Sequence, residues 1–129
     1  MKFLTMQEIA DKVVGHMLLQ NAKAEEASGT GVCLYRAPQG RACAAGCLIK
    51  DEHYSSKLEG RRVCAEEVTE ALRLSGVDMY AYGTGMFVEG LQDIHDYNRV
   101  ESWPERLKAL VESEGLTFNP PVAANVQVL

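Results

Sequence analysis

The residues most able to do chemistry gather in one segment, residues 32–49, which reads VCLYRAPQGRACAAGCLI. Thiols bind metals or act as nucleophiles, and guanidinium groups bind carboxylates and phosphates. Three chemistries follow from this composition: a metal site, a thiol nucleophile or an anion-binding site. The segment holds three of the four cysteines and two arginines: Cys33, Cys43, Cys47, Arg36 and Arg41.

A zinc site would combine Cys33, Cys43 and Cys47 with either His53 or His95. Zinc would hold the loops of a domain of this size in place. The spacing does not favour it, because nine and three residues separate the thiols and no Cys-x-x-Cys pair occurs. We expect no bound metal and no cofactor, and we interpret the cysteines as small buried apolar side chains.

A cysteine nucleophile would pair Cys43 or Cys47 with His95 and Asp96, a set of residues that supports acyl transfer. Adjacent residues on a helix point about 100° apart, so we expect Asp96 to be poorly placed to orient His95. No recognised nucleophile signature surrounds either cysteine. We therefore expect no catalytic residues, with a Cys/His-dependent hydrolase as the alternative.

The doublet His95-Asp96 also occurs in metal-dependent phosphohydrolases, where further histidines complete the metal site. This chain has three histidines in all, and His16 lies in an apolar part of the first expected helix. The doublet therefore does not by itself indicate a phosphohydrolase.

A binding site uses more of the polar residues than any enzymatic alternative does. Tyrosine rings offer flat faces for stacking, and arginine and histidine donate hydrogen bonds to an anionic or nucleobase-like ligand. The two arginines and the histidine–aspartate doublet supply the polar groups. The residues expected to face a ligand or a partner are Tyr35, Arg36, Arg41, His95 and Asp96.

The composition is that of a globular protein of 129 residues, with 47% hydrophobic and 24% charged residues. A net charge of -5 weighs against general binding to nucleic acid or to anionic lipid. The chain turns acidic at Glu8 before any apolar export-signal core develops, and no run reaches the length of a membrane span. We expect a cytoplasmic protein with reduced thiols.

The spacing of apolar residues predicts about four helices, over residues 5–24, 64–74, 85–98 and 103–114. Thr5 with Glu8, and Ser102 with Glu105, form capping boxes at the start of the first and last helices. Gly115 supplies the end of the last helix.

A β-hairpin is predicted over residues 32–36 and 41–45, because each arm is apolar or alternating and Ala-Pro-Gln-Gly between them has turn chemistry. A four-residue loop places Cys33 and Cys43 on opposite faces, whereas a five-residue loop pairs them directly. The sequence leaves this register open.

The expected fold class is therefore α+β, a mostly helical single domain with one small antiparallel β-hairpin. The domain covers residues 1–119, and residues 120–129 form a C-terminal tail or an edge strand. If its apolar end, Val-Gln-Val-Leu, is exposed, it favours a homo-oligomer, because an edge strand pairs with a partner.

Three groups of residues resemble small proteins of unassigned function that bacteriophages and prophages encode. The resemblance spans most of the chain, from the first helix to the last. It implies an accessory protein that acts in the bacterial cytoplasm on a host factor or a host defence pathway. The groups are Cys33-x-Tyr35-Arg36, Cys43-Ala44-x-Gly46-x-Leu48-Ile49-x-Asp51-Glu52-x-Tyr54, and Leu91-Gln92-x-x-His95-Asp96.

By analogy with such proteins, we expect a non-catalytic binder. Its partner would be a host protein that it inhibits, or a small anionic, nucleotide-like signalling ligand that it sequesters in anti-defence. The competing functions are a Cys/His-dependent hydrolase and a small zinc-binding module built on the same hairpin.

Overall fold

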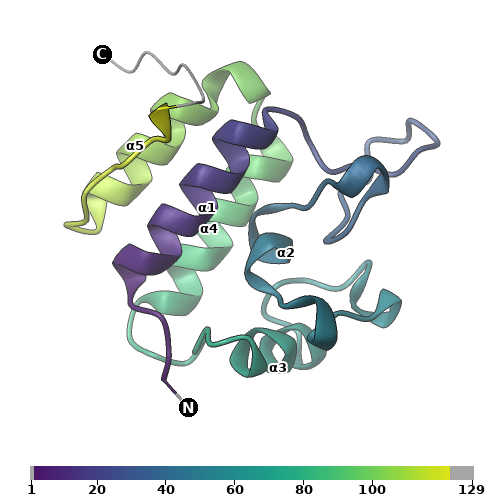
Figure 1. The fold of residues 1–129 in the computed structure, drawn as a ribbon, viewed down its shortest axis with the longest axis horizontal. Helices are drawn as coiled ribbons and strands as arrows, with labels where there is room; N and C mark the ends of the chain where they lie inside the picture. Colours follow the sequence, from purple (N-terminus) through teal and green to yellow (C-terminus); the bar gives the residue numbers. More distant parts are fainter. Residues whose placement is uncertain (1, 123–129) are drawn as a thin grey trace.

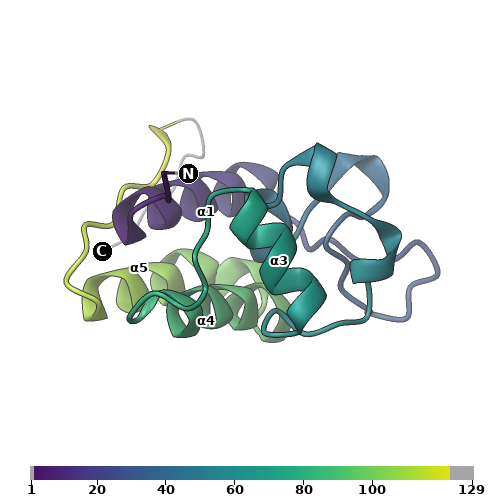
Figure 2. The same cartoon turned by 90° about the horizontal axis from the view of Figure 1, so that it is seen from below.

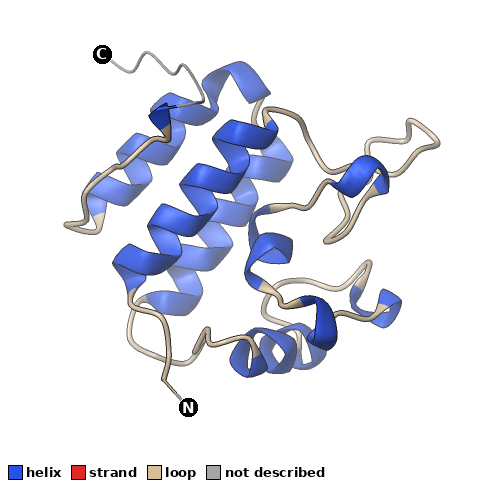
Figure 3. Cartoon of the chain, viewed as in Figure 1, coloured by secondary structure: helices blue, strands red, loops and turns tan. Residues whose placement is uncertain are grey.

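The computed structural model describes residues 2–122, and its regular elements are helices (Figures 1 and 3). Single turns of 3-10 helix lie at Pro38–Gly40, Asp51–His53, Ser56–Leu58 and Val100–Ser102. Over the described residues no β-strand forms, and the antiparallel pairing consists of two isolated bridges. The α-helices are α1 (Met6–Gln20), α2 (Ala44–Leu48), α3 (Glu66–Leu74), α4 (Thr84–Tyr97) and α5 (Trp103–Ser113).

The core lies between α1 and the pair α4 and α5. Figure 2 shows α1 above a layer that α4 and α5 form, and α2 packs against both α1 and α4. Apolar residues at helical spacing on α1, such as Ile9 and Val13, are fully buried, as is Trp103 at the start of α5. Leu48 of α2 and Leu72 of α3 belong to the same cluster, so all five α-helices share one core.

The start of α1 confirms the first capping box. The Glu8 N–H donates to the Thr5 hydroxyl at 3.1 Å, and the Thr5 N–H donates to the Glu8 carboxylate at 2.9 Å. The helix ends at Gln20 rather than near Ala24, because Asn21 adopts the left-handed conformation with a φ of 50°. The following loop then turns back to reach the C-terminal end of α4.

The α+β prediction is wrong, because residues 32–36 and 41–45 form no β-hairpin. One bridge, between Arg36 and Ala42, joins the two arms, and Cys33 pairs with Glu25 instead. Cys43 caps α2, and its sulfur accepts the Gly46 N–H at 3.3 Å. The second predicted arm is therefore the start of a helix.

Burial explains why this segment is helical. The side chains of Ala44, Ala45 and Leu48 are buried where α2 packs against α1 and α4. At Gly46 a Cβ atom would lie 2.1 Å from the Tyr35 carbonyl oxygen, so the two chain segments meet only at glycine. Periodicity does not separate a short apolar helix from a short apolar strand. Over residues 2–122 the fold is all-α, with five α-helices in place of about four helices and a hairpin.

The other predicted helices agree with the structure to within one or two residues at each end. The second capping box is wrong, because the backbone of Ser102 is already helical and its hydroxyl donates to the Arg99 carbonyl at 2.8 Å. Gly115, with a φ of 73°, ends α5 as expected, and the Leu116 N–H donates to the Val111 carbonyl at 3.2 Å.

None of the helices between residues 2 and 122 combines the length and the apolar character that a bilayer crossing requires. The expected tail or edge strand over residues 120–129 lies outside the described residues from residue 123 onward.

Candidate functional site

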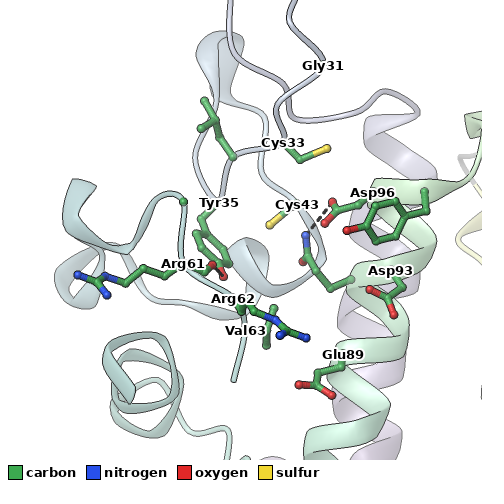
Figure 4. A pocket seen from close by; sticks show the side chains of 14 residues that line it. Gly31, Cys33, Tyr35, Cys43, Arg61, Arg62, Val63, Glu89, Asp93 and Asp96 are labelled. Atoms are coloured by element: carbon green, nitrogen blue, oxygen red, sulfur yellow. Dashed lines mark hydrogen bonds between the residues drawn. The ribbon is translucent and has the colours of Figure 1, made fainter. Parts of the chain in front are cut away.

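A cleft of about 430 Å³ opens between α4 and two loops, residues 31–35 and residues 60–63 (Figure 4). Glu89, Asp93 and Asp96 of α4 line one wall, at positions i, i+4 and i+7 on one side of the helix. The opposite wall carries Tyr35 and Arg62. The volume suits a small molecule of nucleotide size.

Gln92 ties α4 to α2 beside the cleft. Its side-chain oxygen accepts the Ala45 N–H at 2.8 Å, and its amide nitrogen donates to Asp96 Oδ1 at 2.9 Å. The first of these bonds satisfies a backbone donor at the start of α2, where no helical partner exists. Gln92 therefore positions α2 and the Asp96 carboxylate together.

His95 is fully buried and works as a structural connector. Its Nε2 lies 3.1 Å from the Ala24 N–H, which makes this nitrogen an acceptor. The ring proton then resides on Nδ1, which donates to Asp96 Oδ1 at 2.8 Å. The imidazole also stacks on Trp103, with ring centroids 5.3 Å apart.

The expectation that Asp96 is poorly placed to orient His95 is therefore wrong. The Asp96 side chain bends back to the neighbouring ring, which sits in the core, and its carboxylate stays at the edge of the cleft. Helical spacing determines the direction in which each side chain leaves the backbone. The end of the Asp96 side chain can still turn toward the neighbouring imidazole and reach its Nδ1 atom.

Asp96 is held in its ionised form. Burial by itself raises the pKa of this carboxyl, but hydrogen bonds from His95 and Gln92, with a smaller contribution from the nearby Cys33 thiol, outweigh burial and lower the pKa below its ordinary value. Lys23 also donates to the Asp96 carbonyl oxygen at 3.2 Å, which pins the preceding loop to the end of α4. The cleft thus contains a fixed negative charge.

The thiols around the cleft are protonated at neutral pH. Burial, with a smaller contribution from the Asp96 charge, raises the pKa of Cys33 to about 12. Burial also raises the pKa of Cys43, and it raises the pKa of Cys47 to about 12. Cys33 and Cys43 line the same cleft, and the question of hairpin register does not arise because no hairpin forms. A nucleophilic cysteine needs the opposite shift.

Three metal-type ligand atoms meet here, one each from Cys33, His95 and Asp96, within 4.8 Å of one another. Both ring nitrogens of His95 are already used, one as an acceptor and one as a donor. A metal on Nδ1 would move the proton to Nε2, where it would face the Ala24 N–H. The hydrogen bonding of His95 therefore opposes a zinc site in this arrangement.

Tyr35 lines the cleft with its ring, but its polar groups are used in the scaffold. The Tyr35 hydroxyl donates to the Arg61 carbonyl at 2.6 Å. The Tyr35 N–H and the Arg36 N–H donate to the two oxygens of Glu59, at 2.8 Å and 3.1 Å. Glu59 thus holds residues 35 and 36 in position.

Arg36 lies outside the cleft. Its guanidinium donates to the Asp51 carboxylate and to the Ile49 carbonyl, and it sits over the Tyr54 ring at 5.2 Å from the ring centroid. These contacts brace the loop that follows α2.

Arg41 lines a separate hollow with Lys23 and Glu101. The five residues predicted to face a ligand therefore occupy four places. Tyr35 and Asp96 line the cleft, and His95 lies buried behind Asp96. Arg36 and Arg41 are elsewhere, so the structure does not bring the five residues together.

Sequence reasoning did not select Arg62, Glu89 and Asp93, which line the cleft with Asp96. The signal for the acidic wall was present, because Glu89, Asp93 and Asp96 share one side of a helix that the sequence predicts. Arg62, like Arg36, is an arginine that composition offers for anion binding, but a loop residue has no periodicity that assigns the direction of its side chain.

Comparisons with protein-family models, with curated proteins and with solved structures gave no match to this chain.

Proposed function

We propose that this chain is a non-catalytic binding protein that sequesters a small phosphate-bearing, nucleotide-like ligand in the α4 cleft. The observation that carries the proposal is the position of Arg62. Its guanidinium points across the cleft toward α4 (Figure 4), and it forms no ion pair within residues 2–122.

Arg62 is the cationic group best placed to receive a phosphate. Figure 4 shows that the neighbouring Arg61 points away from the cleft, and its guanidinium pairs with Glu67 at 3.3 Å. A guanidinium presents two parallel N–H donors, which match two oxygens of a phosphate. The anionic end of a ligand would therefore lie against residues 60–63.

The opposite wall accepts hydrogen bonds. Asp93 and Asp96 offer carboxylate oxygens to ribose hydroxyls or to an exocyclic amine, and the largely exposed Tyr97 ring offers a face for stacking. A ligand with a phosphate at one end and hydrogen-bond donors at the other satisfies both walls. A nucleotide has this layout, whereas a simple dianion would be repelled by the carboxylates.

The same residues argue against turnover of the ligand. The Cys33 and Cys43 thiols are protonated, and both nitrogens of His95 hold structural hydrogen bonds. Among the described lining residues there is no serine or threonine. The cleft thus presents no activated cysteine, serine or threonine nucleophile, and the imidazole of His95 is not free to act as a general base.

The resemblance of this chain to small bacteriophage and prophage accessory proteins supports a role inside an infected bacterium. Sequestering a nucleotide signal is a stoichiometric task that suits a small protein without catalytic machinery. We therefore place the proposed binding in interference with host defence signalling.

Calorimetric titration with adenosine monophosphate tests the proposal, with adenosine as the ligand that lacks the phosphate. The wild type is expected to bind the monophosphate. Arg62→Gln is expected to bind it at least about tenfold more weakly, a loss of at least about 1.4 kcal/mol. Arg106→Gln, at an exposed site on α5, is the matched control and is expected to bind like the wild type.

Equal affinity of the wild type and Arg62→Gln for the monophosphate would contradict the proposed site. Release of adenosine or phosphate in the same samples would contradict the non-catalytic assignment. Adenosine itself is expected to bind both proteins alike.

A further inference from the structure

An exposed stripe of large side chains runs along α4 beside the cleft. Met86, Asp93 and Tyr97 are spaced by seven and four residues, which places them on one side of the helix. The side of α4 that faces the core carries Phe87, Leu91 and other buried residues instead. Met86 is 82% exposed and Tyr97 is 80% exposed, so this side is without a partner in the described chain.

The turn that leads into α4 carries two further exposed rings, Tyr80 and Tyr82. This turn is closely packed. The Tyr80 N–H donates to the Asp78 carboxylate at 3.0 Å, and a Cβ atom at Gly85 would lie 2.6 Å from the Met79 carbonyl oxygen. The backbone of this turn is therefore held in place before binding, which lowers the ordering cost of recognition.

The charged side chains of α4 and of the turn before it have one sign. Residues 74–98 contain no lysine or arginine, while Asp78, Glu89, Asp93 and Asp96 all lie in this range. Neither Glu89 nor Asp93 forms an ion pair in the part of the chain that the structure describes. Two cationic residues line the opposite wall of the cleft, Arg61 and Arg62. Arg61 pairs with Glu67, and Arg62 forms no ion pair within the described residues.

We propose that this surface, the α4 face, docks a basic amphipathic helix of a partner protein. The face is defined by Tyr80, Tyr82, Met86, Asp93 and Tyr97. Exposed tyrosine and methionine are typical of binding surfaces, and the carboxylates add attraction for lysine and arginine.

Charge decides between the occupants of the α4 face. A second copy of the chain would bring its own carboxylates against the same carboxylates, because a two-fold contact joins a surface to itself. An anionic lipid surface would be repelled for the same reason. The proposal goes beyond ligand binding in the cleft, and Tyr80, Tyr82 and Met86 do not line that cleft.

Two synthetic peptides test the α4 face. One is a basic amphipathic helix of about 14 residues, which spans about four turns, and the other has glutamate at every lysine position. NMR titration of the full chain is expected to show binding of the basic peptide alone, with amide and methyl shifts confined to residues 78–97. Added salt should weaken this binding.

The double variant Tyr82→Ala with Met86→Ala is expected to lose at least about tenfold in affinity for the basic peptide. Leu19→Ala, an exposed apolar site on α1, is the matched control and is expected to bind like the wild type. Both variants should still bind adenosine monophosphate as the wild type does, so failure of this proposal is separable from failure of the cleft proposal.

Binding of both peptides with equal affinity, or shifts spread outside residues 78–97, would overturn the proposal. So would a concentration-dependent dimer that the double variant abolishes, because that result would assign the α4 face to a second copy.

Discussion

Two carboxylates, Glu59 and Asp96, organise polar networks in this protein. They differ in whether both carboxylate oxygens are used by contacts within the fold. Glu59 lies in a loop, and both of its oxygens are filled by the Tyr35 N–H, the Arg36 N–H and the Tyr54 hydroxyl. Asp96 lies at the end of α4 and accepts His95 and Gln92 on a single oxygen, Oδ1. Asp96 also lines the cleft, which Glu59 does not.

The comparison shows that the number of hydrogen bonds does not identify a functional carboxylate. Glu59 accepts mainly from the backbone that it positions, so its role is complete within the fold. Asp96 is held by side chains that themselves anchor other segments, at Ala24 and Ala45. It keeps its charge at the edge of an open cleft, where a ligand can reach it.

Removing the Glu59 carboxylate should have the largest effect, because it leaves two backbone N–H groups without their acceptor. We expect Glu59→Ala to lower the free energy of unfolding by about 2 kcal/mol, measured by urea denaturation. Glu52→Ala, at an exposed site in the preceding turn, should stay within about 0.5 kcal/mol of the wild type. If Glu59→Ala and Glu52→Ala are equally stable, the hydrogen bonds to Glu59 do not stabilise the fold, and its contrast with Asp96 is lost.

Replacing Asp96 should have a smaller effect that depends on pH. Asp96→Asn keeps Oδ1, so we expect a loss of about 1 kcal/mol at neutral pH. The folded-state pKa of Asp96 lies below the ordinary value of 3.8, so its stabilisation is present above that pH and is lost as the pH falls through the folded-state pKa. The variant should therefore lose less stability than the wild type on acidification.

Urea denaturation at about pH 7 and about pH 3 measures this difference. Asp93→Asn serves as the control, because Asp93 lines the same cleft without a hydrogen bond or ion pair in the described chain. It should keep the pH dependence of the wild type. If Asp96→Asn keeps the full pH dependence of the wild type, the hydrogen bonds to the Asp96 carboxylate do not lower its pKa.

Thiol labelling tests whether Cys33 at the cleft is protonated, and it needs no variant of the protein. The pKa of Cys33 is raised to about 12, so at pH 8 only about one molecule in ten thousand carries the thiolate that reacts. Mass spectrometry after brief iodoacetamide treatment should find the label on the exposed Cys64 and not on Cys33. In urea, all four cysteines should react. Equal labelling of Cys33 and Cys64 in the folded protein would reopen thiol chemistry at the cleft.

Local sequence signals were enough to predict most of the helices. The capping box of Thr5 and Glu8 and the glycine at 115 are interactions within a few residues, so the pattern and the structure agree. Helical spacing also placed Gln92, His95 and Asp96 near one another. It misjudged the contact between His95 and Asp96, because burial of the imidazole against Trp103 determines where the ring lies.

The arrangement of the cleft depended on contacts far apart in the chain. Residues 41–45 have the same apolar pattern in a strand or a helix, and packing between α1 and α4 selected the helix. Arg36 had the same composition signal as Arg62, yet Arg36 pairs with the Asp51 carboxylate, whereas Arg62 forms no ion pair within residues 2–122 and points toward the cleft.

Periodicity, caps and glycines thus specify α1, α3, α4 and α5, because these signals act over one or two helical turns. The shared cleft of Cys33 and Cys43, the proton on His95 Nδ1 and the free guanidinium of Arg62 follow from long-range packing. Each depends on which distant group lies within hydrogen-bond distance, and a single sequence contains no periodic pattern for such pairs.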